Sequence, residues 1–113
     1  MEALYDLLHP DCVFISPVVH TPQEGREITY AYLRAANKAL SEDFQYVREV
    51  VQDNHAVLEF TVKVDGIFVN GVDIITFEGD QIVELKVMVR PLKAVNAVWK
   101  QMGEMLEQLK AAS

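Results

Sequence analysis

Near Phe44 the hydrophobic period of this sequence changes from helical to strand-like, and that change limits the possible folds more than any other feature. From Phe44 to Val89 apolar and polar residues alternate, which predicts strands with one buried face. The alternation stops only at three short segments rich in Asp, Asn and Gly, which predict hairpin turns between antiparallel neighbours. We therefore expect four successive strands, at residues 44–51, 55–64, 67–77 and 81–89.

Helical spacing is expected on both sides of this meander. A short helix over residues 2–8 should be followed by a strand from Cys12 to Ser16. The run Thr21-Pro-Gln-Glu24 resembles a capping box and predicts a second helix that begins there and continues to about Leu40. After Pro91 an apolar seam predicts a long C-terminal helix that packs on the protein's own core or, as the alternative, on a partner subunit; its residues are Val95, Trp99, Met102, Leu106 and Leu109.

Length and composition predict one α+β domain over residues 1–113. The formal charge of −7 disfavours nucleic acid as a partner. A long apolar run and a signal-peptide pattern are both missing, which predicts a cytoplasmic protein without a membrane partner. The three histidines lack ligand spacing and no nucleotide-binding or hydrolase motif occurs, so no metal and no cofactor are expected.

Asp73 is the residue that fits its surroundings least well. On the strand over residues 67–77 it shares a face with Gly71, Ile75 and Phe77, which should point inward. A carboxyl group among apolar side chains resists ionisation, and perturbed carboxyl groups cluster at functional sites. The sequence alone leaves a second interpretation open, in which Asp73 is an edge residue satisfied by a backbone amide or water near Gly71.

Two further residues are candidates for a helper role. Ser16 should lie on the same face as Phe14 and reach the mouth of a pocket, although serines at such positions often only cap a loop. His20, in the loop before the second helix, could act as acid or base near neutral pH or could be a solvated loop residue. Tyr32 is expected to place its ring in the core and its hydroxyl near a buried acceptor.

Four segments together resemble the SnoaL-like branch of the NTF2-like superfamily, which includes ketosteroid isomerase and polyketide cyclases. They are Leu8-His-Pro-Asp-Cys-Val-Phe-Ile-Ser-Pro-Val18, Gly25-Arg26, Gly71-Val-Asp-Ile-Ile-Thr-Phe77 and Val87-Met-Val-Arg-Pro-Leu92. The resemblance covers nearly the whole chain and implies a cone of strongly bent antiparallel sheet that helices close around an apolar pocket. It also implies that the family's first helix is absent here.

The same resemblance places Asp73 where ketosteroid isomerase keeps a protonated aspartic acid in its oxyanion hole. The general base of that enzyme matches Ser16-Pro17, which carries no carboxyl group. The tyrosine of the oxyanion hole would belong to the helix that is absent. Steroid isomerisation is therefore not expected.

Two hypotheses about function follow. In the first, the cone binds a small apolar molecule and Asp73 orients it or transfers a proton, with His20 or Ser16 as helper. The pocket would be lined by Phe14, Tyr32, Leu33, Phe60, Val62, Asp73, Ile75, Val87 and Val89. In the second, the protein is a non-enzymatic module that forms a homodimer through the outer face of the sheet, the C-terminal helix, or both.

Overall fold

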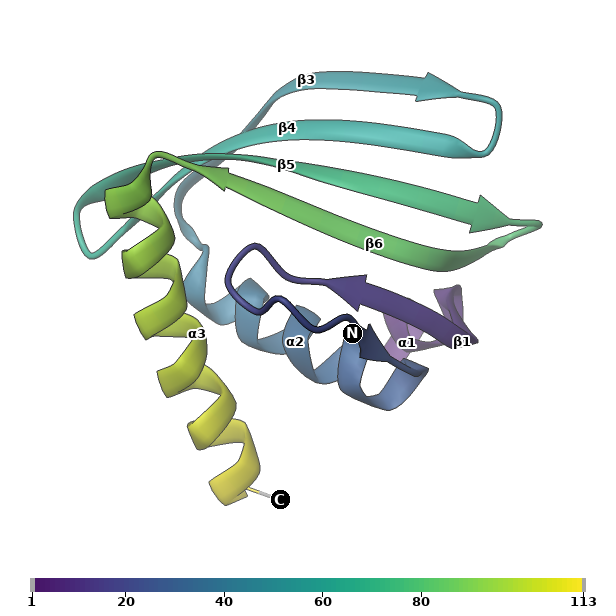
Figure 1. The fold of residues 1–113 in the computed structure, drawn as a ribbon, viewed down its shortest axis with the longest axis horizontal. Coiled ribbons are helices and arrows are strands. Elements are labelled where there is room, and N and C mark those ends of the chain that lie inside the picture. Colours follow the sequence, from purple (N-terminus) through teal and green to yellow (C-terminus); the bar gives the residue numbers. More distant parts are fainter. Residues whose placement is uncertain (1, 113) are drawn as a thin grey trace.

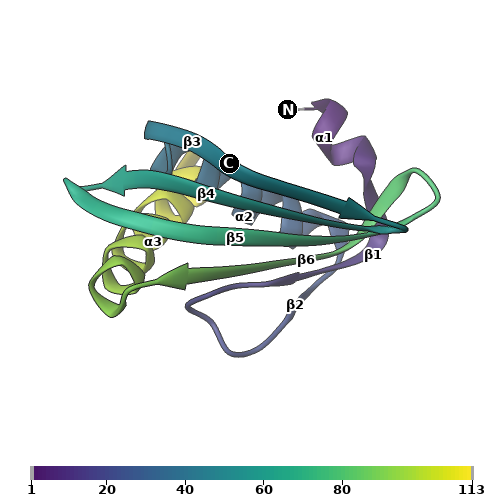
Figure 2. The same cartoon turned by 90° about the horizontal axis from the view of Figure 1, so that it is seen from above.

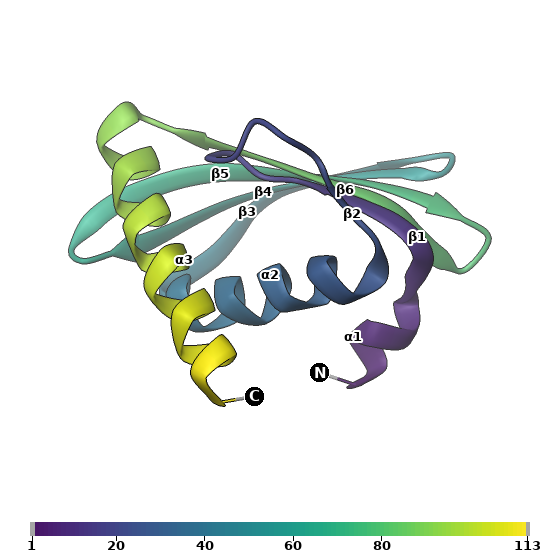
Figure 3. The ribbon, with the colours of Figure 1, turned by 60° about the horizontal axis from the view of Figure 1, so that its bottom comes forward.

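One curved sheet forms the body of the molecule, and helices lie against its concave face (Figures 1 and 3). The computed structural model describes residues 2–112. The strands follow the order β2-β1-β6-β5-β4-β3 across the sheet, and Figure 2 shows them side by side in this order. In chain order the elements are α1 (Glu2–Leu7), β1 (Leu8–Ile15), β2 (Gln23–Glu24), α2 (Arg26–Ala39), β3 (Glu42–Gln52), β4 (His55–Val64), β5 (Ile67–Glu78), β6 (Gln81–Arg90) and α3 (Leu92–Ala112).

The predicted meander is confirmed strand by strand. β3, β4, β5 and β6 pair with antiparallel neighbours, and each turn contains a residue with positive φ. These residues are Asp53, Asp65, Gly66 and Gly79, whose residue types tolerate the left-handed conformation of tight turns. The expected meander of four antiparallel strands is therefore present.

The sheet is antiparallel except at one pair of strands. β1 pairs with β6 in the parallel direction, so the sheet is mixed. β1 also begins four residues earlier than predicted, at Leu8, and its register shifts between Leu8 and Val13. That irregularity accommodates Pro10, which has no N–H for the ladder.

The predicted start of the second helix is also wrong. Gln23 and Glu24 pair with β1 instead of forming a helical turn, and the N–H of Gly25 donates to the Cys12 carbonyl at 2.8 Å. Gly25 has φ 108° and ψ 154°, a conformation that glycine adopts readily, so α2 begins only after it. The buried Thr29 closes the first turn by donating its hydroxyl to the Gly25 carbonyl at 2.8 Å.

Helix α3 packs on the protein's own core, but its buried face is rotated from the predicted seam. Ala94, Val98 and Met102 are buried, whereas Trp99 is 63% exposed. α3 packs against α2 and against the sheet, and these contacts set the rotation of the helix. The predicted side-chain contact of Leu109 lies outside the described residues.

The short helix predicted at the start of the chain is confirmed as α1, which precedes the sheet. It lies below β1 and beside the start of α2 (Figure 3). Tyr5 packs edge-on against Tyr30 of α2, and the guanidinium of Arg26 lies over the Tyr5 ring at 4.8 Å. These contacts place α1 at one end of the concave side of the sheet.

Candidate functional site

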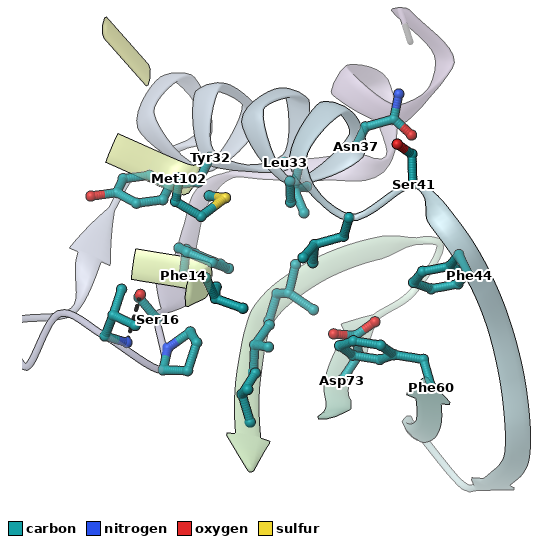
Figure 4. Close-up of a pocket in the computed structure, with 18 of the residues that line it drawn as sticks. Phe14, Ser16, Tyr32, Leu33, Asn37, Ser41, Phe44, Phe60, Asp73 and Met102 are labelled. Atoms are coloured by element: carbon teal, nitrogen blue, oxygen red, sulfur yellow. Dashed lines mark hydrogen bonds between the residues drawn. The ribbon is translucent and has the colours of Figure 1, made fainter. Parts of the chain in front are cut away.

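A cavity of about 470 Å³ lies between the concave face of the sheet and helices α2 and α3 (Figure 4). Its wall is mostly apolar and comes from every helix, from β1, β3, β4, β5 and β6, and from the loop that follows β1. The lining residues are Leu4, Phe14, Ser16, Pro17, Val18, Tyr32, Leu33, Ala36, Asn37, Leu40, Ser41, Phe44, Tyr46, Phe60, Asp73, Leu85, Val87, Val89, Val98 and Met102.

Asp73 supplies the charged group of this wall. It lies in the middle of β5, in register with Leu58 of β4 and Val87 of β6. Its carboxylate points into the cavity (Figure 4). Burial raises the pKa of Asp73 to about 6, because an apolar environment disfavours the charged form. The carboxyl group therefore exchanges its proton near neutral pH.

An aromatic wall stands beside Asp73. The buried ring of Phe60 stacks on Phe44 with centroids 5.3 Å apart, and Phe44 meets Tyr46 edge to face at 5.0 Å. Phe60 reaches this position because Gly71, its partner in register on β5, has no side chain. On the other side of the cavity Phe14 packs against Tyr32 with centroids 5.0 Å apart.

The phenol of Tyr46 is electrostatically coupled to Asp73. Burial contributes most to raising the pKa of Tyr46, and the negative charges of Asp73 and Glu49 raise it further. Tyr46 is 52% exposed, so it lies at the edge of the cavity. At neutral pH Tyr46 is therefore an uncharged phenol close to the carboxyl group.

The structure brings most of the predicted site residues together. Ser16 lines the cavity, and its Oγ also accepts a hydrogen bond from the Val18 N–H at 3.1 Å, as in a loop cap. The predicted residues that border the cavity with Ser16 and Asp73 are Phe14, Tyr32, Leu33, Phe60, Val87 and Val89.

Three predicted residues lie elsewhere. His20 is exposed in the loop before β2 and does not border the cavity. Val62 is buried in the core cluster below α2 and α3, and Ile75 packs against the cluster around Leu8. The inward face of a strand extends beyond the cavity, so strand alternation alone cannot separate lining residues from core residues.

Sequence reasoning missed several residues of the wall. Phe44 and Tyr46 alternate on β3 and could have been found from that spacing. Leu4, Asn37 and Ser41 carry no such signal, because only the packing of α1 and α2 brings them to the cavity. Among the described residues no three His, Cys, Asp or Glu side chains lie close enough together to hold a metal ion.

Comparisons with known proteins agree with this geometry. Residues 1–85, from α1 into β6, match the family model of the SnoaL-like domain. The chain belongs to the SnoaL-like family. No functionally curated protein matches this SnoaL-like chain.

Solved structures include two relatives above 30% identity. A steroid delta-isomerase from Pseudomonas aeruginosa is 37% identical, with a TM-score of 0.91. The match covers 96% of this chain and 81% of the isomerase chain. An uncharacterised protein with a cystatin-like fold from Silicibacter pomeroyi is 32% identical, with a TM-score of 0.85 over 91% of this chain and 73% of its own.

A third solved structure shares the fold at lower identity. An NTF2-like protein of unknown function from Mesorhizobium loti is 22% identical, with a TM-score of 0.71 over 79% of this chain and 76% of its own. This SnoaL-like chain therefore has an NTF2-like fold related to that of an isomerase. Within residues 2–112 no helix is both long and apolar enough to cross a membrane.

Proposed function

We propose that this SnoaL-like protein binds a small molecule with a large apolar body in the cone cavity and that Asp73 binds the one polar group of that molecule. The carboxyl group of Asp73 carries the proposal, because it points into a mostly apolar cavity of about 470 Å³. Small-molecule sites commonly combine such an apolar wall with a few convergent polar groups. The similarity to a protein described as a steroid delta-isomerase supports an apolar ligand.

Proton transfer on the bound molecule is the enzymatic form of this proposal. A general acid or base works best when its pKa lies near the operating pH, and burial places the pKa of Asp73 at about 6. Ser16 is the better placed of the two predicted helpers, since it borders the cavity and His20 does not. A reaction of the isomerase or cyclase type includes such a proton transfer, and Asp73 is the acidic side chain of the cavity wall that could carry the proton.

A matched pair of substitutions on β6 tests binding in the cavity. Val87 lines the cavity beside Asp73, its partner in register on β5. The next residue, Met88, is 50% exposed on the other face of the strand. Val87→Phe places a larger side chain in the cavity beside Asp73 and should strongly reduce the fluorescence increase of Nile red, a neutral apolar dye. Met88→Phe adds a ring to the same strand and should leave dye binding unchanged.

Thermal unfolding of both variants checks that they fold. Equal dye binding by the two folded variants would show that the dye lies outside the cavity and would contradict the proposal. Loss of dye binding in the Val87 variant alone supports it.

Homodimerisation through the convex face of the sheet is a second candidate function. Val50, Phe68 and Met88 are each about half exposed on this face, at 49%, 55% and 50%. A shallow pocket between β3 and β6 joins Met88 to Val57 and Val72. Exposed apolar patches of this kind often mark interfaces.

Sedimentation of the Met88→Asp variant tests this second candidate. A charge at the centre of an apolar interface is costly to bury, so the variant should sediment as a monomer under conditions in which the unmodified protein is a dimer. Glu104→Lys, on the exposed face of α3, serves as the control for a change in surface charge. A monomeric unmodified protein at micromolar concentration would remove this candidate.

A further inference from the structure

The cavity holds a carboxyl group but no basic side chain. Among the described residues that line it, Asp73 is the only carboxylic acid, and no Lys, Arg or His is present. The lining side chains that carry polar atoms are Ser16, Tyr32, Asn37, Ser41, Tyr46 and Asp73. Asp73 forms neither of the two ion pairs found within the described residues. Its charge is therefore available to a ligand.

We propose that the apolar ligand of this cavity carries one protonated amine and that its ammonium group binds the carboxylate of Asp73. This inference rests on the proposed function and names the chemical class of the ligand. The apolar body of the molecule occupies the wider part of the cavity, between the sheet and α2.

The aromatic wall beside Asp73 favours a cation. Phe44, Tyr46 and Phe60 all border the cavity, and their rings contact one another with centroids about 5 Å apart. Aromatic faces attract ammonium groups through their negative quadrupole, and the attraction is strongest where water is excluded. An alcohol or ketone gains nothing comparable from these rings.

The acidic residue nearest to Asp73 on the concave face of the sheet adds a second negative charge. Glu49 of β3 is in register with Leu58, which is in register with Asp73, so the two acidic residues share the concave face of the sheet. Besides Asp73, the titratable side chains that line the cavity are the phenols of Tyr32 and Tyr46. The lining residues contributed by α1, β1, β6 and α3 have no titratable group. The local potential is therefore negative.

Titration of Asp73 gives this proposal a pH dependence. Because its pKa is about 6 in the empty cavity, the carboxyl group of Asp73 is mostly ionised above pH 7. A bound ammonium group stabilises the ionised form and lowers the pKa of Asp73, so amine affinity should fall as pH falls through 6. A neutral hydrogen-bond acceptor would show the opposite trend, because it needs the protonated acid as donor.

Two isosteric probes, 1-naphthylmethylamine and 1-naphthylmethanol, separate these alternatives by isothermal titration calorimetry. At about pH 7.5 we expect the amine to bind about tenfold more tightly than the alcohol, and about tenfold more weakly at pH 5 than at pH 7.5. Asp73→Asn should remove the preference for the amine and leave alcohol binding within about threefold. Glu104→Gln removes one negative charge from the exposed face of α3 and should leave both affinities unchanged.

The outcomes distinguish this inference from the proposed function. If the alcohol binds more tightly than the amine, and Val87→Phe removes that binding, the ligand is not an amine. The proposal that the cavity binds an apolar molecule would still stand. An amine preference that survives Asp73→Asn would also overturn the inference, since it would reflect only the net negative charge of the protein. Binding of neither probe would contradict the proposed function itself.

Discussion

The ring of Phe60 lies directly over Gly71, so close that a Cβ on Gly71 would be 2.3 Å from Cζ of the ring. Phe60 is 1% exposed and stacks on Phe44, which holds the ring against the backbone of β5. Because Phe60 occupies the place of a side chain at Gly71, the space in front of Asp73, two residues further along β5, stays open. One missing side chain thus contributes to the shape of the cavity.

Gly71→Ala should therefore destabilise the protein and distort the cavity. The new methyl group collides with a fully buried ring, and overpacking of this kind costs about 1–3 kcal/mol of unfolding free energy. Urea unfolding measures the loss. Gly103→Ala on α3 is the matched control, because a Cβ there meets no atom within 4 Å and alanine favours the helix.

A double-mutant cycle identifies the cause of the loss. Combining Gly71→Ala with Phe60→Leu removes the edge of the ring that the methyl group meets, so the two effects should be less than additive. Additive losses would show that the collision is not the origin of the effect.

The stability of the protein should depend on pH through Asp73. Its pKa is about 6 in the folded state and near 3.8 in the unfolded state, so between these values the folded state binds the proton more tightly. Stability must then fall as pH rises from about 4 to about 6, and the loss persists above pH 6. Asp73→Asn should be more stable than the unmodified protein at pH 7 by on the order of 1–3 kcal/mol.

Urea unfolding of the two proteins at several pH values measures this difference, in which the contributions of the other carboxyl groups cancel. The stability advantage of the asparagine variant should disappear below about pH 4. A constant difference at all pH values would mean that Asp73 titrates as an ordinary surface carboxyl group.

Tyr46 should report the charge of Asp73. Since the ionised carboxyl group is one of the causes that raise the pKa of Tyr46, Asp73→Asn should lower that pKa without restoring its usual value, because burial remains. Glu49→Gln should lower it as well, and by less. NMR titration of the tyrosine ring carbons measures these shifts, and Glu104→Gln should produce none. If the pKa of Tyr46 is the same in the Asp73 variant as in the unmodified protein, the two side chains are too far apart to interact.

Much of this site could be predicted because strand alternation is a local property. Once Phe60 is taken as inward, period two assigns Asp73 to the concave face through the pairing of β4 with β5. The start of α2 depends instead on the contact of Gly25 with Cys12, thirteen positions away in the chain. The outward direction of Trp99 depends on how α3 packs against α2. Neither contact leaves a local pattern.

The convex face of the sheet contains a polar row that crosses four strands. Asn70 of β5 donates from Nδ2 to Glu59 Oε2 and to the Phe60 carbonyl, both at 3.0 Å, and its Oδ1 accepts from Arg90 at 3.5 Å. Arg48 of β3 lies 3.4 Å from the other oxygen of Glu59. Asn70 is half-buried, so its amide links these groups where water reaches only part of it.

Asn70→Asp should weaken this row with almost no change of shape. The substitution removes both donated hydrogen bonds and places a carboxylate beside that of Glu59, which should cost about 1–3 kcal/mol of unfolding free energy at pH 7. The repulsive part of the loss should shrink at high salt and at pH values that protonate the new carboxyl group. Urea unfolding measures the loss, with Asn96→Asp on the exposed side of α3 as the control. If the two variants are equally stable, the hydrogen bonds of the Asn70 amide add no more to stability than hydrogen bonds to water.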